Sequence, residues 1–334
     1  MKLSYLATLS LLSILTTGCY NPPGNDEKSV VTKRYIHALG FDVSQNEWES
    51  HAYPGRVVTT LRNGVIINAS YDQEGLLNGP LTHTYPHSQT IESLSLYEKG
   101  HLTKKTFYNI RGIPEQEQVF LSPHHFKMIK WYQSGTPMSI EEYHQTQLLE
   151  GNYYNLNNEL ESRVSKGVGT KIKRDQNGQM TLKEEIDHGY PILKTTFYPH
   201  GIPHTITPLI GNQIEGEKKV FALTGEPLSH ELYKNNQLNG LAVYFQNGCR
   251  YLEVPYKDGL KHGIERHYID GETLAEETHW HEGHKHGASI VYFDGMSKTD
   301  WYYNNDHVSK EKYDQLCRQE ENIAIMNERS KLVP

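Results

Sequence analysis

The sequence predicts an all-β fold, an elongated antiparallel meander of about eleven β-hairpin repeats with a C-terminal capping helix. The first observation is a period: an aromatic residue recurs at steps of 23, 24 and 23, at Tyr233, Tyr256, Trp280 and Tyr303. A second set of residues keeps the same step, at Gly216, Gly240, Gly263 and Gly287. Self-similarity at a fixed period of roughly 20 to 50 residues is typical of repeat architectures.

The third observation is the turn chemistry inside each period. Asn-Gly and Asp-Gly pairs recur at steps of 11, 12 and 24 residues, at Asn247-Gly248, Asp258-Gly259, Asp270-Gly271 and Asp294-Gly295. These dipeptides favour the tight turns of β-hairpins because their residues tolerate positive φ. Two turns per period predict two strands per repeat. We expect the repeat aromatics to be half-buried, with the ring packed and the tyrosine hydroxyl in water.

The chain begins with a predicted export signal, residues 1–18, in which Lys2 precedes an apolar run. Gly18 and Cys19 resemble the lipobox of bacterial lipoproteins, although Thr16 stands where leucine is usual. The resemblance implies that Cys19 carries a lipid that anchors the protein to a membrane, outside the cytoplasm. In a Gram-negative cell the absence of Asp after this cysteine favours the outer membrane over the inner one. Residues 19–29 are predicted to be a tether.

An N-terminal cap is predicted over residues 30–56, with a strand near its start and a short helix that carries Trp48. Ser44 and Glu47 have the capping-box spacing for that helix. The repeat array is predicted over residues 57–308. Segments 122–128 and 151–168 lack the repeat order and are expected to be loop insertions, with a boundary between two repeat blocks as the alternative. Residues 309–334 are predicted to be a helix and tail, because apolar residues recur there at helical spacing. Capping of the last strand is the favoured role of this helix, and binding a partner is the alternative.

The repeats resemble the MORN repeat, and more closely its variant in bacterial proteins of the YwqK type. Those units read Tyr-x-Asn/Asp-Gly-x-x-x-Gly, followed by an aromatic residue and a second glycine turn. The residues that carry the resemblance and define the repeats are Tyr233, Gly240, Tyr244, Gly248, Tyr256, Gly259, Gly263, Tyr268, Gly271, Trp280, Gly283, Gly287, Tyr292 and Gly295.

Histidines offer the main candidates for metal chemistry. The densest cluster is His279, His281, His284 and His286. In the related repeats, however, the position of His286 recurs for turn geometry. The sequence also lacks an HExxH motif and a cysteine pair, so no metal site and no cofactor are predicted.

No catalytic residue is predicted either. The pairs Glu141-Glu142 and Glu276-Glu277 are adjacent, so in a strand their carboxylates point to opposite faces. Ser122 beside His124 and His125 lacks a third group that would orient a catalytic histidine.

The net charge of −7 and the lack of a Lys/Arg-rich segment argue against nucleic acid as a partner. The leading hypothesis is therefore a lipid-anchored interaction or structural surface without catalysis, for an unknown protein or glycan partner. Open sheet edges would also allow self-association. The rival hypotheses are a cytoplasmic antitoxin-type partner-binding protein, which the predicted export signal opposes, and a metal-binding protein. Cys249 and Cys317 are either joined in a disulfide or free.

Overall fold

Antiparallel hairpins account for most of the chain in the computed structural model, which describes residues 29–331. The predicted signal segment, Cys19 and most of the predicted tether lie outside the described residues. The chain divides into two units, Met1–His101 and Leu102–Pro334. Within each unit the strands pair antiparallel with their neighbours in sequence, so the predicted meander is confirmed.

The first unit is a small sheet with one short helix. Its elements are β1 (Val30–His37), β2 (Asp42–Val43), α1 (Gln45–His51), β3 (Gly55–Leu61), β4 (Ile66–Tyr71), β5 (Leu77–Thr84) and β6 (Ile91–Glu98). β1 pairs with both β2 and β3, and the other strands follow as consecutive hairpins.

The helix predicted around Trp48 is present as α1. The Ser44 hydroxyl accepts a hydrogen bond from the backbone N–H of Glu47, and the Glu47 carboxylate accepts one from the backbone N–H of Ser44. This reciprocal pair satisfies two backbone donors at the helix N-terminus. The Trp48 ring packs 5.6 Å from the ring of Tyr35 and 6.0 Å from that of Tyr71, which ties the helix to the sheet.

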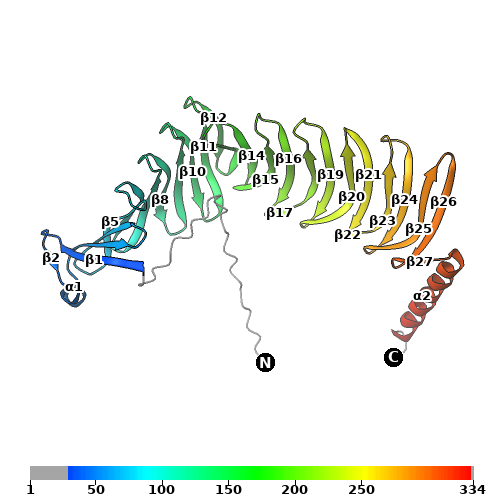
Figure 1. The fold of residues 1–334 in the computed structure, drawn as a ribbon, viewed down its shortest axis with the longest axis horizontal. Helices are drawn as coiled ribbons and strands as arrows, with labels where there is room; N and C mark the ends of the chain where they lie inside the picture. The colour runs from blue at the N-terminus through cyan, green and yellow to red at the C-terminus, as the bar shows by residue number, and fades with distance from the viewer. Residues whose placement is uncertain (1–28, 332–334) are drawn as a thin grey trace. The chain divides into compact units, whose positions relative to one another are not determined.

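The second unit is a longer antiparallel meander that runs through β27 and ends in a helix. Figure 1 shows its strands following one another in sequence order. Its elements are β7 (His101–Tyr108), β8 (Pro114–Ser122), β9 (His125–Trp131), β10 (Pro137–His144), β11 (Gln147–Tyr154), β12 (Leu160–Ser165), β13 (Val168–Arg174), β14 (Met180–Asp187), β15 (Tyr190–Phe197), β16 (Pro203–Ile210), β17 (Gln213–Ile214), β18 (Gly216–Phe221), β19 (Pro227–Lys234), β20 (Gln237–Gln246), β21 (Cys249–Lys257), β22 (Leu260–Lys261), β23 (Gly263–Tyr268), β24 (Leu274–His281), β25 (His284–Phe293), β26 (Met296–Tyr303), β27 (Asp306–Val308) and α2 (Lys310–Lys331).

Two segments that were expected to be loop insertions are strands, so that expectation was wrong. Segment 122–128 contains the tight β8–β9 hairpin, in which Phe120 pairs with Phe126 and Ser122 with His125. Segment 151–168 contains part of β11 and all of β12, which pair through Gly151 and Val164. The cause is pairing with the adjacent strands: a segment without repeat signals still forms a strand when the strands before and after it supply its hydrogen bonds.

The repeat-defining glycines all have positive φ, and Gly240 shows why. Glu231 pairs with Ala242 and Tyr233 pairs with Leu238, so residues 239–241 of β20 face Leu232 alone and form a bulge. Gly240 has φ +119°, and a Cβ atom there would lie 2.9 Å from Cδ1 of Leu232. A side chain is therefore excluded both by the backbone conformation and by its neighbour.

The buried hydrophobic cluster of the second unit lies in its N-terminal part, on β11, β12 and β14. Leu148, Tyr153, Val164 and Ile186 form a cluster, with Tyr153 only 1% exposed and Val164 fully buried. Leu148 and Tyr153 belong to β11, Val164 to β12 and Ile186 to β14. Packing of neighbouring hairpins therefore buries the apolar side chains, as expected for repeats that cannot bury them alone.

The predicted C-terminal helix is present as α2 and lies against the last hairpin. The ring of Tyr313 is 5.1 Å from that of Trp301 and 5.4 Å from that of His286. The Tyr303 hydroxyl donates a hydrogen bond to Glu320. Cys317, on the same helix, and Cys249 are both free thiols, which decides between the two alternatives left open.

Neither described helix has the length and apolar character needed to cross a membrane.

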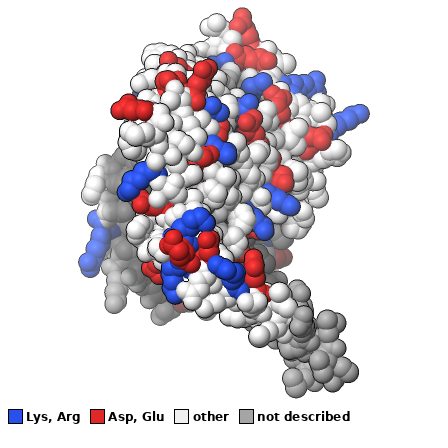
Figure 2. Space-filling view, turned by 90° about the vertical axis from the view of Figure 1, so that its right-hand side faces the viewer, with Lys and Arg blue, Asp and Glu red and all other residues white. Residues whose placement is uncertain are grey.

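Charges of both signs intermingle on the described part of the face at the C-terminal end of the second unit (Figure 2). Ion pairs on β26 and α2 join charges close in sequence: the Lys298 ammonium is 3.1 Å from the Asp300 carboxylate, and the Lys310 ammonium is 3.0 Å from the Asp314 carboxylate. On the face in view, cations therefore have anions close by.

Candidate functional site

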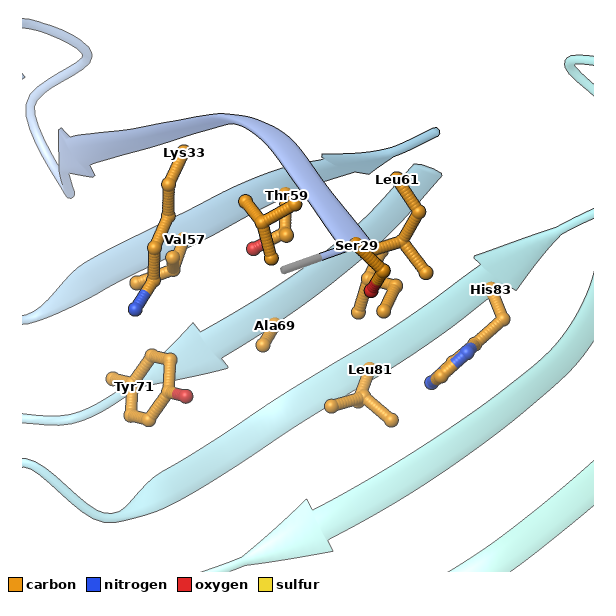
Figure 3. Close-up of a pocket in the computed structure, with 11 residues that line it drawn as sticks. Ser29, Lys33, Val57, Thr59, Leu61, Ala69, Tyr71, Leu81 and His83 are labelled. Atoms are coloured by element: carbon orange, nitrogen blue, oxygen red, sulfur yellow. The ribbon is translucent and has the colours of Figure 1, made fainter. Parts of the chain in front are cut away.

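A pocket of about 320 Å³ opens on one face of the first unit (Figure 3). Its floor is aliphatic and comes from alternate positions of β3, β4 and β5. Val57, Ala69 and Leu81 form one cross-strand row, and Leu61 and Ile67 extend the floor. Alternate residues of a strand share a face, so the strand register alone assembles this surface.

Thr59 places a hydroxyl among the floor residues, and charged or ring-bearing polar groups lie at the ends of this pocket. Figure 3 shows Lys33 and Tyr71 at one end and His83 at the other. The Lys33 ammonium is 5.2 Å from the centroid of the Tyr35 ring, a cation–π contact. Among the described residues, no carboxylate lies within ion-pair distance of Lys33. An apolar floor with a cation at its rim can hold a molecule that has an apolar body and a negative end. No motif in the sequence singled out this pocket.

A second hollow, which we call the terminal groove, is formed by Ile269, Leu274, Tyr292, Phe293 and Met296. It has a volume of about 540 Å³ and lies where the β23–β24 and β25–β26 turns are neighbours at the same end of the second unit. Ile269 is 74% exposed, Met296 60% and Phe293 48%. A cluster of large exposed apolar side chains is a feature of binding surfaces.

A ladder of carboxylates and tyrosines runs across the last hairpins. The Tyr268 hydroxyl donates to Glu253 at 3.0 Å, and the Tyr292 hydroxyl donates to Glu277 at 2.9 Å, one period later. A guanidinium binds each carboxylate: Arg250 binds Glu253 at 2.7 Å, and Arg266 binds Glu277 at 2.8 Å. Both rings are half-buried, as expected, and each hydroxyl bonds to a carboxylate of the protein.

The ladder shifts the pKa values of its members. Burial and the Glu253 carboxylate raise the pKa of Tyr268, and the hydrogen bond to Glu277 raises that of Tyr292. Burial alone would raise the pKa of Glu277, but Arg266 and Tyr292 outweigh it and lower the value. The signal for the ladder was in the sequence, because Glu253 and Glu277 are separated by the repeat step of 24 residues.

The four clustered histidines do not form one group. His281, His284 and His286 line a hollow of about 560 Å³ that Glu320 of α2 also lines, whereas His279 is not part of it and pairs with Ile264 on β23. His286 Nδ1 is 3.0 Å from the side-chain oxygen of Asn304. Among the side chains that the structure describes, no three from His, Cys, Asp or Glu are placed to hold a metal ion.

The adjacent glutamates lie in separate environments, as strand alternation predicts. Glu141 is buried beside Tyr143, Tyr153 and Lys171, whereas Glu142 binds His125 and Lys127. Burial alone would raise the pKa of Glu142, but the hydrogen bonds from His125 and Lys127 outweigh it and lower the value.

His125 does have a carboxylate partner, at 2.6 Å from Glu142, which its sequence neighbourhood did not reveal. Ser122 lies opposite His125 in the strand register and is exposed. An exposed serine at a hairpin end provides no enclosed position for a substrate, so we assign no catalytic role to this pair.

The Asp270 turn beside the terminal groove leads to a pH prediction. The carboxylate accepts hydrogen bonds from the backbone N–H and hydroxyl of Thr273 and the backbone N–H of Glu272, which lower the pKa of Asp270 to about 2. The unfolded-state pKa is about 3.9, so the ionised carboxylate stabilises the turn above about pH 4, and this contribution is lost as the pH falls through about 2.

We therefore expect Asp270→Asn to destabilise the protein at about pH 5 and to have little effect near pH 2. Hydrogen exchange of the Thr273 amide at both pH values measures the difference. If the variant changes the exchange protection of the Thr273 amide equally at both pH values, the role assigned to the Asp270 carboxylate is contradicted.

Comparison of the sequence with known protein families and with curated proteins finds no match.

Proposed function

We propose that this protein is a lipid-anchored, extracytoplasmic repeat protein of the MORN-like type that binds another protein and carries out no catalysis. The observation that carries the proposal is the terminal groove, where Ile269, Phe293 and Met296 are exposed together. Burying such side chains against a partner stabilises the complex by roughly 25 cal/mol for each Å² of apolar surface removed from water. The surrounding hairpins hold these residues on turns whose geometry is fixed by glycine, so little ordering is needed on binding.

The anchor part of the proposal rests on Gly18 and Cys19 and on the apolar run before them. Several acyl chains on one cysteine, at about 0.8 kcal/mol per buried methylene, would hold the chain on a membrane essentially permanently. We favour the outer membrane if the cell is Gram-negative.

Photocrosslinking in intact cells tests the groove. A photoreactive phenylalanine analogue at Phe293 is expected to give a discrete adduct, and the same analogue at Ile210, which is 69% exposed elsewhere on the second unit, is expected to give none. Adding Ile269→Glu to the protein that carries the analogue at position 293 should abolish the adduct, because the substitution places a charged group in the groove. An adduct of twice the chain mass would identify a second copy as the partner. Adducts of equal yield from both positions, or an adduct that Ile269→Glu leaves intact, would overturn the proposal.

Metabolic labelling tests the anchor separately. A clickable palmitate analogue is expected to label the wild-type chain and not Cys19→Ala, and the variant should leave the membrane fraction. Labelling that persists in Cys19→Ala, or an unlabelled wild-type chain that keeps residues 1–18, would refute the anchor without bearing on the groove.

A further inference from the structure

The pocket of the first unit has the shape and chemistry of a site for a flexible apolar chain. Its floor consists mainly of aliphatic side chains, with Thr59 among them, and the rings of Tyr71 and His83 lie at its two ends (Figure 3). A floor of this kind offers dispersion contacts along a methylene chain but little stacking surface for a planar ring. Val57, Leu61 and Ala69 are almost fully buried, so the floor is held rigidly by its own packing.

The positive charge at the rim favours a ligand with an anionic group at one end. Lys33 is exposed, it lines the pocket, and no described carboxylate pairs with it. A lysine ammonium at a solvent-exposed rim remains hydrated while its stem covers apolar surface. An anionic head group beside it would gain an ion pair without desolvating the charge fully.

The volume limits the number of chains. Small-molecule sites range over roughly 300 to 1,000 Å³, and this pocket, at about 320 Å³, is at the lower end. It suits one chain and not the two chains of a phospholipid.

We propose that the first unit binds a single-chain fatty acid, with its methylenes on the floor formed by Val57, Ala69 and Leu81 and its carboxylate beside Lys33. This function is separate from the protein contact proposed for the terminal groove. It also does not depend on the lipid anchor, so either can fail without the other.

Calorimetry with dodecanoate below its critical micelle concentration and dodecanol below its solubility limit tests the proposal on the chain from residue 20 to the C-terminus, which includes every described residue. We expect both probes to bind, with dodecanoate the tighter. Lys33→Gln should weaken the binding of dodecanoate about fivefold, the size expected for the loss of one partly exposed ion pair. The affinity for dodecanol should stay within about twofold of the wild-type value. Arg56→Gln is the matched control, because it removes a cation from a neighbouring strand at the position adjacent to the floor residue Val57, on the opposite face. It should change neither affinity.

Ala69→Leu provides a second variant, because the larger side chain fills the floor. It should weaken both probes at least about tenfold, and circular dichroism shows whether it is folded. The proposal is overturned if dodecanoate does not bind at about 1 mM, if Arg56→Gln weakens it as much as Lys33→Gln does, or if a folded Ala69→Leu protein binds both probes as wild type does.

Discussion

Replacing Gly169 by alanine is expected to destabilise the second unit by more than about 3 kcal/mol, which places it among the most damaging single substitutions. Gly169 has φ +144°, and a Cβ atom there would lie 2.9 Å from Cα of Val164 and closer still to the carbonyl oxygen of Arg163. Both atoms are backbone atoms of the paired strand β12, so no side-chain rotation can relieve the overlap. Val164 also belongs to the buried core, so moving its strand disturbs the packing.

Urea unfolding followed by circular dichroism measures this loss, and hydrogen exchange shows whether it centres on β12 and β13. Gly201→Ala is the matched control, since Gly201 has φ +83° but no neighbouring atom within 4 Å of the place that a Cβ atom would occupy. The control variant should lose only about 1 to 2 kcal/mol of stability, which is the cost of placing a non-glycine residue at positive φ. If the two variants lose the same stability, the close approach of β12 is not what requires glycine at position 169.

The second large effect is expected at Glu141, which is only 4% exposed. Its carboxylate is 3.0 Å from the ammonium of Lys171 and accepts hydrogen bonds from the hydroxyls of Tyr143 at 3.0 Å and Tyr153 at 3.1 Å. Burial alone would lower the pKa of Lys171, but Glu141 and Tyr143 outweigh it and raise the value. Burial and the Glu141 charge together raise the pKa of Tyr143 to about 12.

Glu141→Gln should therefore cost roughly 3 to 5 kcal/mol, because it leaves the Lys171 charge partly buried without its counter-charge. The double variant Glu141→Gln with Lys171→Met should recover much of this loss, since the orphaned charge is then absent as well. Equilibrium unfolding of the two single variants and the double variant gives the coupling energy between the two side chains.

The neighbouring Glu142 is the control for this network. Glu142→Gln removes contacts to His125 and Lys127 on the other face, where the side chains are more exposed, and should cost below about 1 kcal/mol. The network also has a pH signature. Because the pKa of Lys171 is raised on folding, its contribution is complete below about pH 10 and is lost as the pH rises through the folded value. A Glu141→Gln protein whose stability falls just as steeply above about pH 10 as that of wild type would contradict this assignment.

Local chemistry made parts of the fold predictable from the sequence. Ser44 and Glu47 cap α1 through groups only three residues apart, so no distant contact was needed to place that helix. The prediction for the segment around Phe120 and Phe126 was wrong because that segment carries no such local signal. It lacks the turn dipeptides of the other repeats, and its strands form because β8 and β10 both offer edges to β9.

The candidate sites required more than local signals. Glu141 and Lys171 are separated by 30 residues, and Lys33 reaches a pocket whose floor is built from three later strands. Bulges shift the register between these strands repeatedly, and each one-residue shift exchanges the two faces of a strand. The sheet face on which a side chain lies, and the side chain that it contacts, therefore could not be assigned from the spacing of residues in the chain.

The sequence by itself determined the hairpin meander, its step of about two dozen residues and the helix at its end, because turn glycines and helix-capping residues act within a few positions of one another. Only the tertiary structure decided which carboxylate meets which tyrosine, which side chains form the pocket of the first unit, and which apolar residues stay exposed in the terminal groove. Those outcomes depend on the cross-strand register, which is set by the pairing of whole strands.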